Sequence, residues 1–478
     1  MSDQPKKLVM VVVDALKPSM LDRAIAAGRA PAMAMIQERG VYVGDCVAAF
    51  PSVTPVCAAT ITTGVGPDEH LIPSMNWYHR EEERYVEYGS SFSASRQFGV
   101  VRSLTDTVYR MNDEHLSREI DTVFESLDDI DVRTAGTTYL IYRGRHRHEV
   151  ANESALARIV TSTLFRRTIY GPQELFYADL YASRRTGCRG QLELPGARDQ
   201  HTGCVGAYLA EHDLFDFLLF SLPDNDAYSH RNGPHAQVTS IAAADRQIER
   251  LMHAAGGPEE FLDTHAVIVL SDHSQAPVEE RIRLDLAFDD FDVATPSPAR
   301  SIGAEIALSP AQRSAMIYAL DQDHADTLVR RSIGAEIALS PAQRSAMIYA
   351  LDPDRVDQIS ERAIATACEV DGVDLVMSLA DRDSDQPEAV VRGHRGELRF
   401  TAGGSLQDRR GERWSVDGDL SVLRAEIQDD RFLSTEYPDA LSRIWSALRC
   451  PNAGEVLLSA APSYEFVDWG GSDHVGGG

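Results

Sequence analysis

The chain has 478 residues, of which 43% are hydrophobic, an ordinary fraction for a globular protein. This length exceeds what one compact core usually holds, so we expect a single large domain, residues 1–478, that carries insertions. Its 46 Lys and Arg against 73 Asp and Glu give a formal net charge of -27, which argues against an extended surface for a nucleic-acid polymer or an anionic membrane.

The first apolar segment, 8–13, is rich in valine and ends at Asp14. A continuous run of this kind is typical of a strand that is covered on both faces of a parallel sheet, which puts Asp14 at the carboxyl end of that strand. A helical pattern follows at 18–39 and is closed by Gly40, and 41–47 then predicts a second strand.

Apolar runs at 214–222 and 266–270 predict two further strands, each followed directly by a polar cluster. The stretch 238–252 between them has the spacing of an amphipathic helix. Its apolar face comprises Ile241, Ile248, Leu251 and Met252. Strands that alternate with helices and end in polar residues predict a doubly wound α/β fold, with a mostly parallel sheet, helices on both faces, and ligands outside the carboxyl ends of the strands.

Two regions look inserted into this plan, about 80–200 and about 290–430. The first includes the basic run Arg143–Arg147, which we interpret as a solvated loop. The second contains SIGAEIALSPAQRSAMIYALD twice, letter for letter, at 301–321 and 332–352. Such an unchanged copy indicates a very recent duplication or an assembly error, and it is not a solenoid, which needs three or more units. Each copy predicts an amphipathic helix, and we expect the surplus copy to lie loosely on the surface.

The cysteines and the apolar segments bear on the compartment. We interpret the six scattered cysteines, which form no CxxC pair, as reduced and mostly buried thiols. The first apolar run lacks a signal-peptide cleavage pattern, and no later stretch approaches the roughly 20 apolar residues of a membrane span. These features predict a cytoplasmic protein. The cysteines are Cys46, Cys57, Cys188, Cys204, Cys368 and Cys450.

Side chains that suit metal ions occur in five separate segments, at strand ends or helix starts. They are Asp14, Thr54, Asp226 with His230, Asp272 with His273, and His474. Asp226 and His230 are four residues apart, so on a helix they share one face and can share an ion. Each residue alone also fits a helix cap or a turn. The adjacent pair Asp272 and His273, just past the strand 266–270, has little structural reason to end a buried strand.

The segment FPSVTPVCAATITTG around Thr54 resembles the nucleophile segment of nucleotide pyrophosphatase/phosphodiesterases, a family of the alkaline phosphatase superfamily, in which a threonine after Phe-Pro-Ser-x begins a helix. Asp14, the Asp-x-x-x-His at 226–230 and the Asp-His at 272–273 fall in that family's order and approximate spacing. The resemblance covers about half of the chain, in separated blocks. It implies an alkaline-phosphatase-like fold and metal-dependent hydrolysis of phosphodiester or pyrophosphate bonds in small phosphorylated or nucleotide substrates.

The resemblance also implies two divalent metal ions and a covalent phosphothreonine intermediate on Thr54. It assigns one ion to Asp14, Thr54, Asp272 and His273, and gives the other ion Asp226 and His230 as two of its three ligands. Asp224 competes with Asp226, but the spacing of four favours Asp226. Coordination stabilises a threonine alkoxide, and two ions can hold the attacking and leaving oxygens in line. Carboxylate, imidazole and alkoxide ligands favour zinc, with manganese as the main rival.

Two assignments depart from the family pattern. Asn76 is expected to donate a hydrogen bond to a phosphoryl oxygen, but Met75 occupies the family's asparagine position, and a turn role for Asn76 is the alternative. The family's last ligand is a histidine in a His-Gly step, whereas His474 precedes Val475. Either His474 completes the first metal site, or the closing segment that carries this ligand has been lost.

Several other functions remain open. A phosphonate hydrolase would use the same threonine and metals, a phosphomonoesterase shares them, and a phosphomutase would use a serine, for which Ser52 is the nearby candidate. A sulfatase is excluded, because Cys57-Ala58-Ala59 lacks the required proline and arginine. From another class, the chain could be a truncated, inactive acidic binding protein. The sequence does not predict an oligomeric state.

Overall fold

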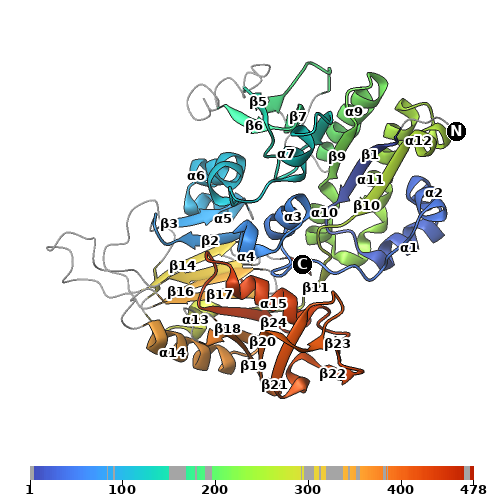
Figure 1. Cartoon of the computed structure of the whole chain (residues 1–478). Coiled ribbons are helices and arrows are strands. Elements are labelled where there is room, and N and C mark those ends of the chain that lie inside the picture. Colours follow the sequence, from blue (N-terminus) through green and yellow to red (C-terminus); the bar gives the residue numbers. More distant parts are fainter. Residues whose placement is uncertain are drawn as a thin grey trace.

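A six-stranded sheet, shown with its flanking helices in Figure 1, forms the centre of this computed structural model. In spatial order its strands are β10 (His265–Leu270), β1 (Lys7–Val13), β9 (Phe217–Leu222), β4 (Thr134–Thr137), β7 (Glu174–Tyr177) and β8 (Tyr181–Ala182). All neighbouring pairs are parallel except β7–β8. The three strands predicted at 8–13, 214–222 and 266–270 therefore lie next to one another, with the valine-rich strand in the middle.

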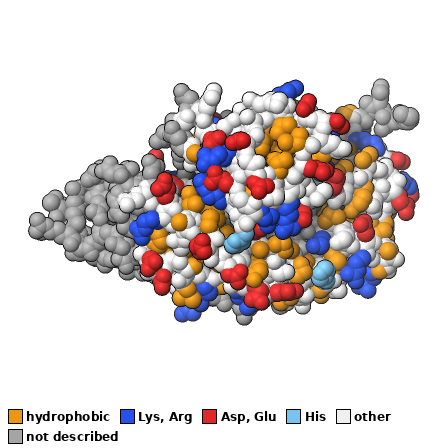
Figure 2. Space-filling model, turned by 90° about the horizontal axis from the view of Figure 1, so that it is seen from below, with side chains coloured by type: hydrophobic (Ala, Val, Ile, Leu, Met, Phe, Trp, Pro, Cys, Tyr) orange, Lys and Arg blue, Asp and Glu red, His pale blue; other side chains and the backbone are white. Residues whose placement is uncertain are grey.

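The structure describes most of the chain. The described residues are 5–82, 84–89, 92–149, 168–177, 180–188, 196–291, 293–294, 306–311, 314–318, 337–342, 345–350, 356–380, 384, 386–467 and 474–477. Among them, no helix has both the length and the apolar character needed to cross a membrane. Figure 2 shows acidic and basic side chains interspersed over one face, without a continuous basic stretch in that view.

Helices cover both faces of the central sheet (Figure 1). One face packs against α1 (Pro18–Ala26), α2 (Pro31–Arg39), α9 (Ala197–Glu211), α11 (Val238–Ala254) and α12 (Pro258–Thr264). The other face packs against α3 (Thr54–Thr63) and α7 (Val123–Asp128). The odd-numbered valines of β1 belong to the first core and Val12 belongs to the second. The predicted doubly wound α/β fold is confirmed, and all four apolar residues predicted for one face of α11 are buried.

Two local predictions near the start of the chain were wrong. The helical pattern at 18–39 is two helices, because the chain turns at Gly28, which has a φ of +64°, and restarts at Pro31, which has no N–H for a continuing helix. The segment 41–47 is irregular, and Val41 is 93% exposed. Both edges of β1 are already paired, with β9 and β10, so this segment has no partner there.

A second sheet, of twelve strands, comes from the later part of the chain. Its strands are β13 (Val293–Ala294), β14 (Ile306–Ala311), β15 (Ser314–Tyr318), β16 (Ile337–Ala342), β17 (Ser345–Ala350), β24 (Val456–Ala460), β18 (Val373–Ala380), β19 (Glu388–Gly393), β20 (Gly396–Gln407), β23 (Arg431–Ser434) and β22 (Ala425–Gln428), with β21 (Arg413–Gly418) paired to β20. Helices α14 (Val356–Glu369) and α15 (Ala440–Arg449) contact β18.

Both copies of the duplicated segment contribute strands to this second sheet, so the predicted amphipathic helix was wrong. The first copy supplies the hairpin β14–β15 and the second copy supplies β16–β17. Strand β17 pairs with β24, and the first copy pairs in turn with the second. The surplus copy therefore pairs into the sheet and is not loosely attached as predicted. The edge of β24 offers backbone hydrogen-bond partners, and such tertiary pairing overrides a modest helix propensity.

The remaining elements connect and flank the two sheets. Among the described residues the further helices are α4 (Pro67–His70), α5 (Phe92–Phe98), α6 (Val100–Thr105), the π-helix η1 (Asp106–His115), α10 (Asp224–Asn232), the 3₁₀-helices η2 (Pro234–Ala236) and η3 (Leu420–Leu423), and α13 (Leu284–Ala287). The two-stranded pairs are β2 (Asn76–His79) with β3 (Arg84–Glu87), β5 (His146–His148) with β6 (Ile169–Gly171), β11 (Ala276–Pro277) with β26 (Gly476–Gly477), and β12 (Glu280–Ile282) with β25 (Tyr464–Phe466). Strands β4 and β7 show that the expected insertion at about 80–200 also supplies strands to the central sheet.

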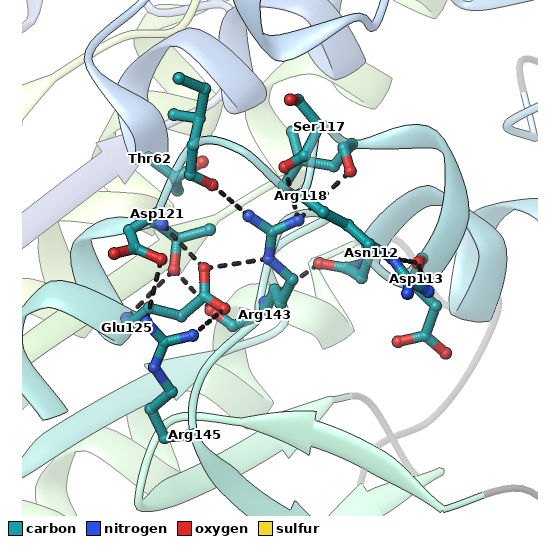
Figure 3. A network of polar contacts seen from close by, with 12 residues as sticks. Thr62, Asn112, Asp113, Ser117, Arg118, Asp121, Glu125, Arg143 and Arg145 are labelled. Carbon is teal, nitrogen blue, oxygen red and sulfur yellow. Dashed lines mark hydrogen bonds and ion pairs between the residues drawn. The ribbon is translucent and has the colours of Figure 1, made fainter. Parts of the chain in front are cut away.

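Arg143 is buried, not part of a solvated loop as predicted. Figure 3 shows its guanidinium beside Glu125, whose Oε2 atom accepts a hydrogen bond from Nε at 2.9 Å. The same side chain donates to the carbonyl oxygens of Leu116 (3.2 Å), Ser117 (2.9 Å) and Ile120. A guanidinium has five N–H donors, so it can satisfy a whole turn of backbone carbonyls at once. Arg143 therefore ties α7 to the segment that precedes it.

The interpretation of all six cysteines as reduced was wrong for Cys188 and Cys204, which form a disulfide with their Cα atoms 5.8 Å apart. This bond attaches the segment before α9 to that helix. Disulfides persist mainly in oxidising compartments, so this one does not support the cytoplasmic expectation, which stays a prediction. Of the cysteines outside this disulfide, two are buried, one is partly buried and one is exposed: Cys57, Cys450, Cys368 and Cys46.

Candidate active site

The carboxyl end of β1 brings Asp14 to the centre of the site. Its backbone N–H donates to the carbonyl oxygen of Leu222, the last residue of β9, at 3.1 Å. The carboxylate oxygen Oδ1 is buried and has no hydrogen-bond partner among the described residues. Burial and the neighbouring carboxylates of Asp272 and Asp226 raise the pKa of Asp14 well above its ordinary value. A bound cation would relieve both the missing partner and the charge repulsion.

Thr54 begins α3, and its hydroxyl lies beside His273. Pro55 follows it, and proline suits the first turn of a helix because the N–H that it lacks would have no partner there. The Oγ1 atom of Thr54 lies 3.1 Å from Nε2 of His273. The start of a helix carries partial positive charge, so negative charge on a group bound at Thr54 is favoured.

Asp272 and His273 follow β10 after one intervening residue, Ser271, and are both buried. The Oδ1 atom of Asp272 accepts hydrogen bonds from the N–H groups of Ala15 (3.1 Å) and His273 (2.9 Å), which fixes this carboxylate between the ends of β1 and β10. The Nε2 atom of His273 lies 3.7 Å from Oδ1 of Asp14 and 3.6 Å from Oδ2 of Asp272. The parallel pairing of β1 with β10 is what brings these groups together.

Asp226 and His230 lie one turn apart on α10, as their spacing of four predicts. The Oδ2 atom of Asp226 is 3.1 Å from Nε2 of His230. The other ring nitrogen, Nδ1, lies 3.1 Å from the carbonyl oxygen of Gly476, which orients the ring toward Asp226. Burial acts to raise the pKa of Asp226, but His230, His273 and Gln275 together outweigh it, so the pKa lies well below the usual range.

Three of these side chains form a compact cluster. One ligand atom from each of Asp14, Asp226 and His273 lies within 4.8 Å of the other two. Two carboxylates and an imidazole are donors that suit zinc or manganese. Since Oδ1 of Asp14 also lacks a hydrogen bond within the described part of the chain, this donor set fits a divalent cation.

His474 lies beside His230. The two ring centroids are 5.2 Å apart, and the N–H of Val475 donates to the carbonyl oxygen of His230 at 3.0 Å. Both ring nitrogens of His474 are buried without a hydrogen bond among the described residues, and Nδ1 lies 3.6 Å from Oε2 of Glu465. The pairing of β26 with β11 holds the segment in this place. His474 therefore lies beside the Asp226–His230 pair. Its role as a metal ligand stays a prediction, as does the alternative that the closing segment with this ligand has been lost.

The structure does not bring the amide of Asn76 to the site. Its side chain is fully buried, and Nδ2 donates to Oε2 of Glu87 on the paired strand β3 at 3.1 Å. The preceding residue, Met75, lines the cavity beside Thr54. Successive side chains of a strand point to opposite faces, so the offset of one residue turns Asn76 away.

A cavity of about 260 Å³ opens beside the assembled residues. The predicted residues in its wall are Asp14, Thr54, Asp226, His230 and Asp272. Sequence reasoning missed an aromatic part of the wall, formed by Tyr88, Tyr139 and Tyr177, and one arginine, Arg198. These four residues stand in no motif. The only signal for Arg198 is its place at the start of a helix that packs on the site's sheet.

Asp224 serves a different purpose from Asp226. Its Oδ1 atom accepts a hydrogen bond from Nε of Arg198 at 2.9 Å, and its Oδ2 atom accepts one from the N–H of Asp199 at 2.9 Å. Asp224 thereby joins the start of α10 to the start of α9. This pairing agrees with a supporting role for Asp224, and it leaves Asp226 as the carboxylate beside His230.

Most of the chain matches known proteins, by a family model and by structural similarity. The family model for type I phosphodiesterase/nucleotide pyrophosphatase matches residues 8–362. Phosphonoacetate hydrolase from Sinorhizobium meliloti 1021, solved with phosphonoformate and with phosphonoacetate, is similar in structure at 16% identity and a TM-score of 0.51, over 96% of this chain and 82% of that one. An inactive murine ectonucleotide pyrophosphatase/phosphodiesterase 5 in complex with AMP gives 9% identity and a TM-score of 0.53, over 99% and 83%.

At these identities the two structures show a shared fold and nothing finer. The comparison with curated proteins gives no match. The family model, in contrast, spans the first strand, the helix that begins at Thr54 and both Asp-His elements. The chain therefore belongs to the type I phosphodiesterase/nucleotide pyrophosphatase family of the alkaline phosphatase superfamily and is a phosphoric ester hydrolase.

Proposed function

We propose that the chain hydrolyses phosphodiester or pyrophosphate bonds of small nucleotide-type substrates, with Thr54 as the nucleophile and two divalent metal ions, zinc or manganese, as cofactors. The observation that carries this proposal is the 3.1 Å contact between Oγ1 of Thr54 and Nε2 of His273, beside the cluster with Asp14 and Asp226. A hydroxyl at a helix start is thus combined with donors that suit these metals.

The residues divide into two sets of ligands. One ion would be held by Asp14, Thr54, Asp272 and His273, and the other by Asp226, His230 and His474. Among the described residues, the ring nitrogens of His474 and Oδ1 of Asp14 make no hydrogen bond, which supports this division. When bound, divalent ions offset the repulsion between the carboxylates and stabilise ionised oxygens of the hydroxyl and of the leaving group.

The chain's own residues then account for two displacement steps. Oγ1 of Thr54 forms a bond to phosphorus while the bond from phosphorus to the leaving oxygen breaks. The hydroxyl proton passes to solvent, and the leaving oxygen takes up a proton. Water then breaks the bond between Oγ1 and phosphorus and restores the hydroxyl, so one water is consumed for each bond cleaved. The N-terminal end of α3 favours the negative charge of the phosphoryl group throughout.

A serine-based phosphomutase is disfavoured by the position of Ser52. Its hydroxyl donates to the carbonyl oxygen of Ala49 at 3.0 Å and accepts a hydrogen bond from Nη2 of Arg443 at 3.1 Å. Ser52 is not among the residues that line the cavity beside Thr54. Phosphonate and phosphomonoester hydrolysis would use the same threonine, so substrate tests separate them.

The test compares bis-(4-nitrophenyl) phosphate with 4-nitrophenyl phosphate, each with zinc and with manganese. We expect metal-dependent diester hydrolysis, and a fall in kcat of about a thousandfold or more in Thr54→Ala. The matched control is Thr63→Ala on the same helix, because that hydroxyl donates to the carbonyl oxygen of Ala59 at 2.7 Å and accepts from the N–H of Val65 at 3.5 Å, away from the cavity beside Thr54. Full activity in Thr54→Ala would remove Thr54 as the nucleophile. A chain that neither binds metal nor hydrolyses either ester would instead be the inactive binding protein.

A further inference from the structure

Arg198 is the one Lys or Arg side chain among the described residues that line the cavity beside Thr54. Its Nε atom donates to Oδ1 of Asp224 at 2.9 Å, and Nη2 donates to the carbonyl oxygen of Pro223 at 3.2 Å. Within the described part of the chain, Nη1 makes no hydrogen bond, and 44% of the side chain is exposed. The guanidinium is therefore held at two points and still has N–H donors available at the cavity wall.

The anchor of Arg198 belongs to the same frame as the proposed metal ligands. Asp224 begins α10, two residues before Asp226, and its N–H donates to Oδ1 of Asp199 at 3.0 Å. The N–H of Asp199 donates in return to Oδ2 of Asp224 at 2.9 Å. This reciprocal pair locks the starts of α9 and α10 together. The guanidinium of Arg198 is therefore anchored where the starts of these two helices meet.

Of the described charged side chains in the cavity wall, Arg198 is the one that can attract an anionic group of a substrate. The carboxylates there, Asp14, Asp226 and Asp272, are matched to cations and repel anions. The chain as a whole has a formal net charge of -27, so its overall charge does not attract an anionic substrate. A guanidinium presents parallel N–H groups that fit the paired oxygens of a phosphate or a carboxylate.

We propose that Arg198 is a specificity-determining residue that binds a second anionic group of the substrate, attached next to the phosphorus that Thr54 attacks. This inference rests on the proposed function and deepens it. A second phosphate in a pyrophosphate and the carboxylate of a phosphonocarboxylate offer the same paired oxygens. A simple aryl diester has its single negative charge on the reacting phosphorus and offers nothing further to Arg198.

The experiment measures kcat/KM on ATP, phosphonoacetate and bis-(4-nitrophenyl) phosphate for the unaltered chain, Arg198→Gln and Arg198→Lys. In Arg198→Gln we expect a loss of about 10- to 100-fold on ATP or phosphonoacetate, and less than about threefold on the aryl diester. Arg198→Lys keeps the charge and should recover part of the loss. Arg250→Gln removes an exposed arginine from α11 and should change none of the three values.

The outcomes separate the two proposals. A selective loss on ATP supports a phosphate as the second anion, and a selective loss on phosphonoacetate supports a carboxylate. An equal fall on all three substrates would mean that Arg198 only holds α10 in place, and it would overturn this inference while the proposed function stands. Cleavage of the aryl diester alone by the unaltered chain would overturn it in the same way. Failure of the unaltered chain on every substrate would overturn both.

Discussion

The two sheets of this protein differ in where the residues after their strands arrive. In the central sheet β1, β9 and β10 run in the same direction, so the polar residues that follow them meet at one edge. In the second sheet most described neighbours run in opposite directions, so residues after adjacent strands lie at opposite edges. Parallel pairing therefore brings the proposed ligands together from distant segments of the chain. The second, mostly antiparallel sheet contributes none of them from its described strands.

The most direct way to break this comparison is to alter a strand end of the central sheet. Asp14→Asn removes a charged oxygen from the cluster, and we expect kcat/KM for the diester to fall by at least about 100-fold. Bound metal, measured by elemental analysis, should fall with it. Asp22→Asn on the exposed side of α1 is the matched control and should leave both values unchanged. Unaltered metal content in Asp14→Asn would mean that the end of β1 is only structural.

The disulfide tests how much a covalent bond adds to the stability of the central sheet and the helices that cover it. Replacing both Cys188 and Cys204 with Ser should lower the free energy of unfolding by about 3 kcal/mol, because the bond closes a loop over a sequence separation of 16. Denaturant titration measures this difference. Cys46→Ser, at an exposed free thiol, is the control. If the double variant unfolds with the same midpoint, the tie contributes nothing in solution.

His70 tests the junction between the two regions, because α4 contacts both α3 and α15. Its Nδ1 atom accepts a hydrogen bond from the N–H of Ile72 at 3.1 Å, and Nε2 faces the hydroxyl of Thr60 at 3.2 Å. Burial lowers the pKa of His70 to about 3. The unfolded chain binds this proton below about pH 6.5, so the free energy of unfolding should fall between that pH and about 3, by at most about 1.4 kcal/mol per unit.

Unfolding titrations at several pH values check this slope. His70→Asn should flatten it, and the exposed His253→Asn should not. An identical slope in all three proteins would show that His70 does not stay neutral in the folded state.

The smallest effect is expected in the second sheet. Deleting residues 301–331 removes one copy of the duplicated segment and leaves an arginine before the remaining copy, as now. The remaining hairpin can still pair with β24, so we expect the free energy of unfolding to change by less than about 1 kcal/mol and diester hydrolysis to persist. Melting curves and initial rates test this. A protein that no longer folds would show that the sheet needs both copies.

The sequence predicted the central sheet well because each of its main strands is a continuous apolar run with a polar end. It also pointed to the proposed ligands, since Asp226 with His230 and Asp272 with His273 are local patterns. Predictions failed where a distant partner decides the outcome. The segment 41–47 has no free edge to pair with, whereas the duplicated segment finds β24.

Register and long-range contacts limited the rest of the site. Asn76 was misplaced because one residue of offset reverses the side of a strand, which no local pattern reveals. Arg198 and Tyr139 reach the cavity only through tertiary packing, so no spacing indicates them. Cysteine spacing likewise did not reveal that Cys188 and Cys204 come together.

The pairing of Lys7 with His265 also has a consequence for how the protein is made. Ribosomes add about 5 to 20 residues per second, so β1 waits on the order of ten to fifty seconds before its neighbour β10 exists. During that time an apolar, valine-rich strand has an open edge, which is a hazard for association with other nascent chains. A nascent chain that ends before Asp272 lacks His273 and cannot form the cluster with Asp14 and Asp226. The proposed active site can therefore form only after more than half of the chain has been synthesised.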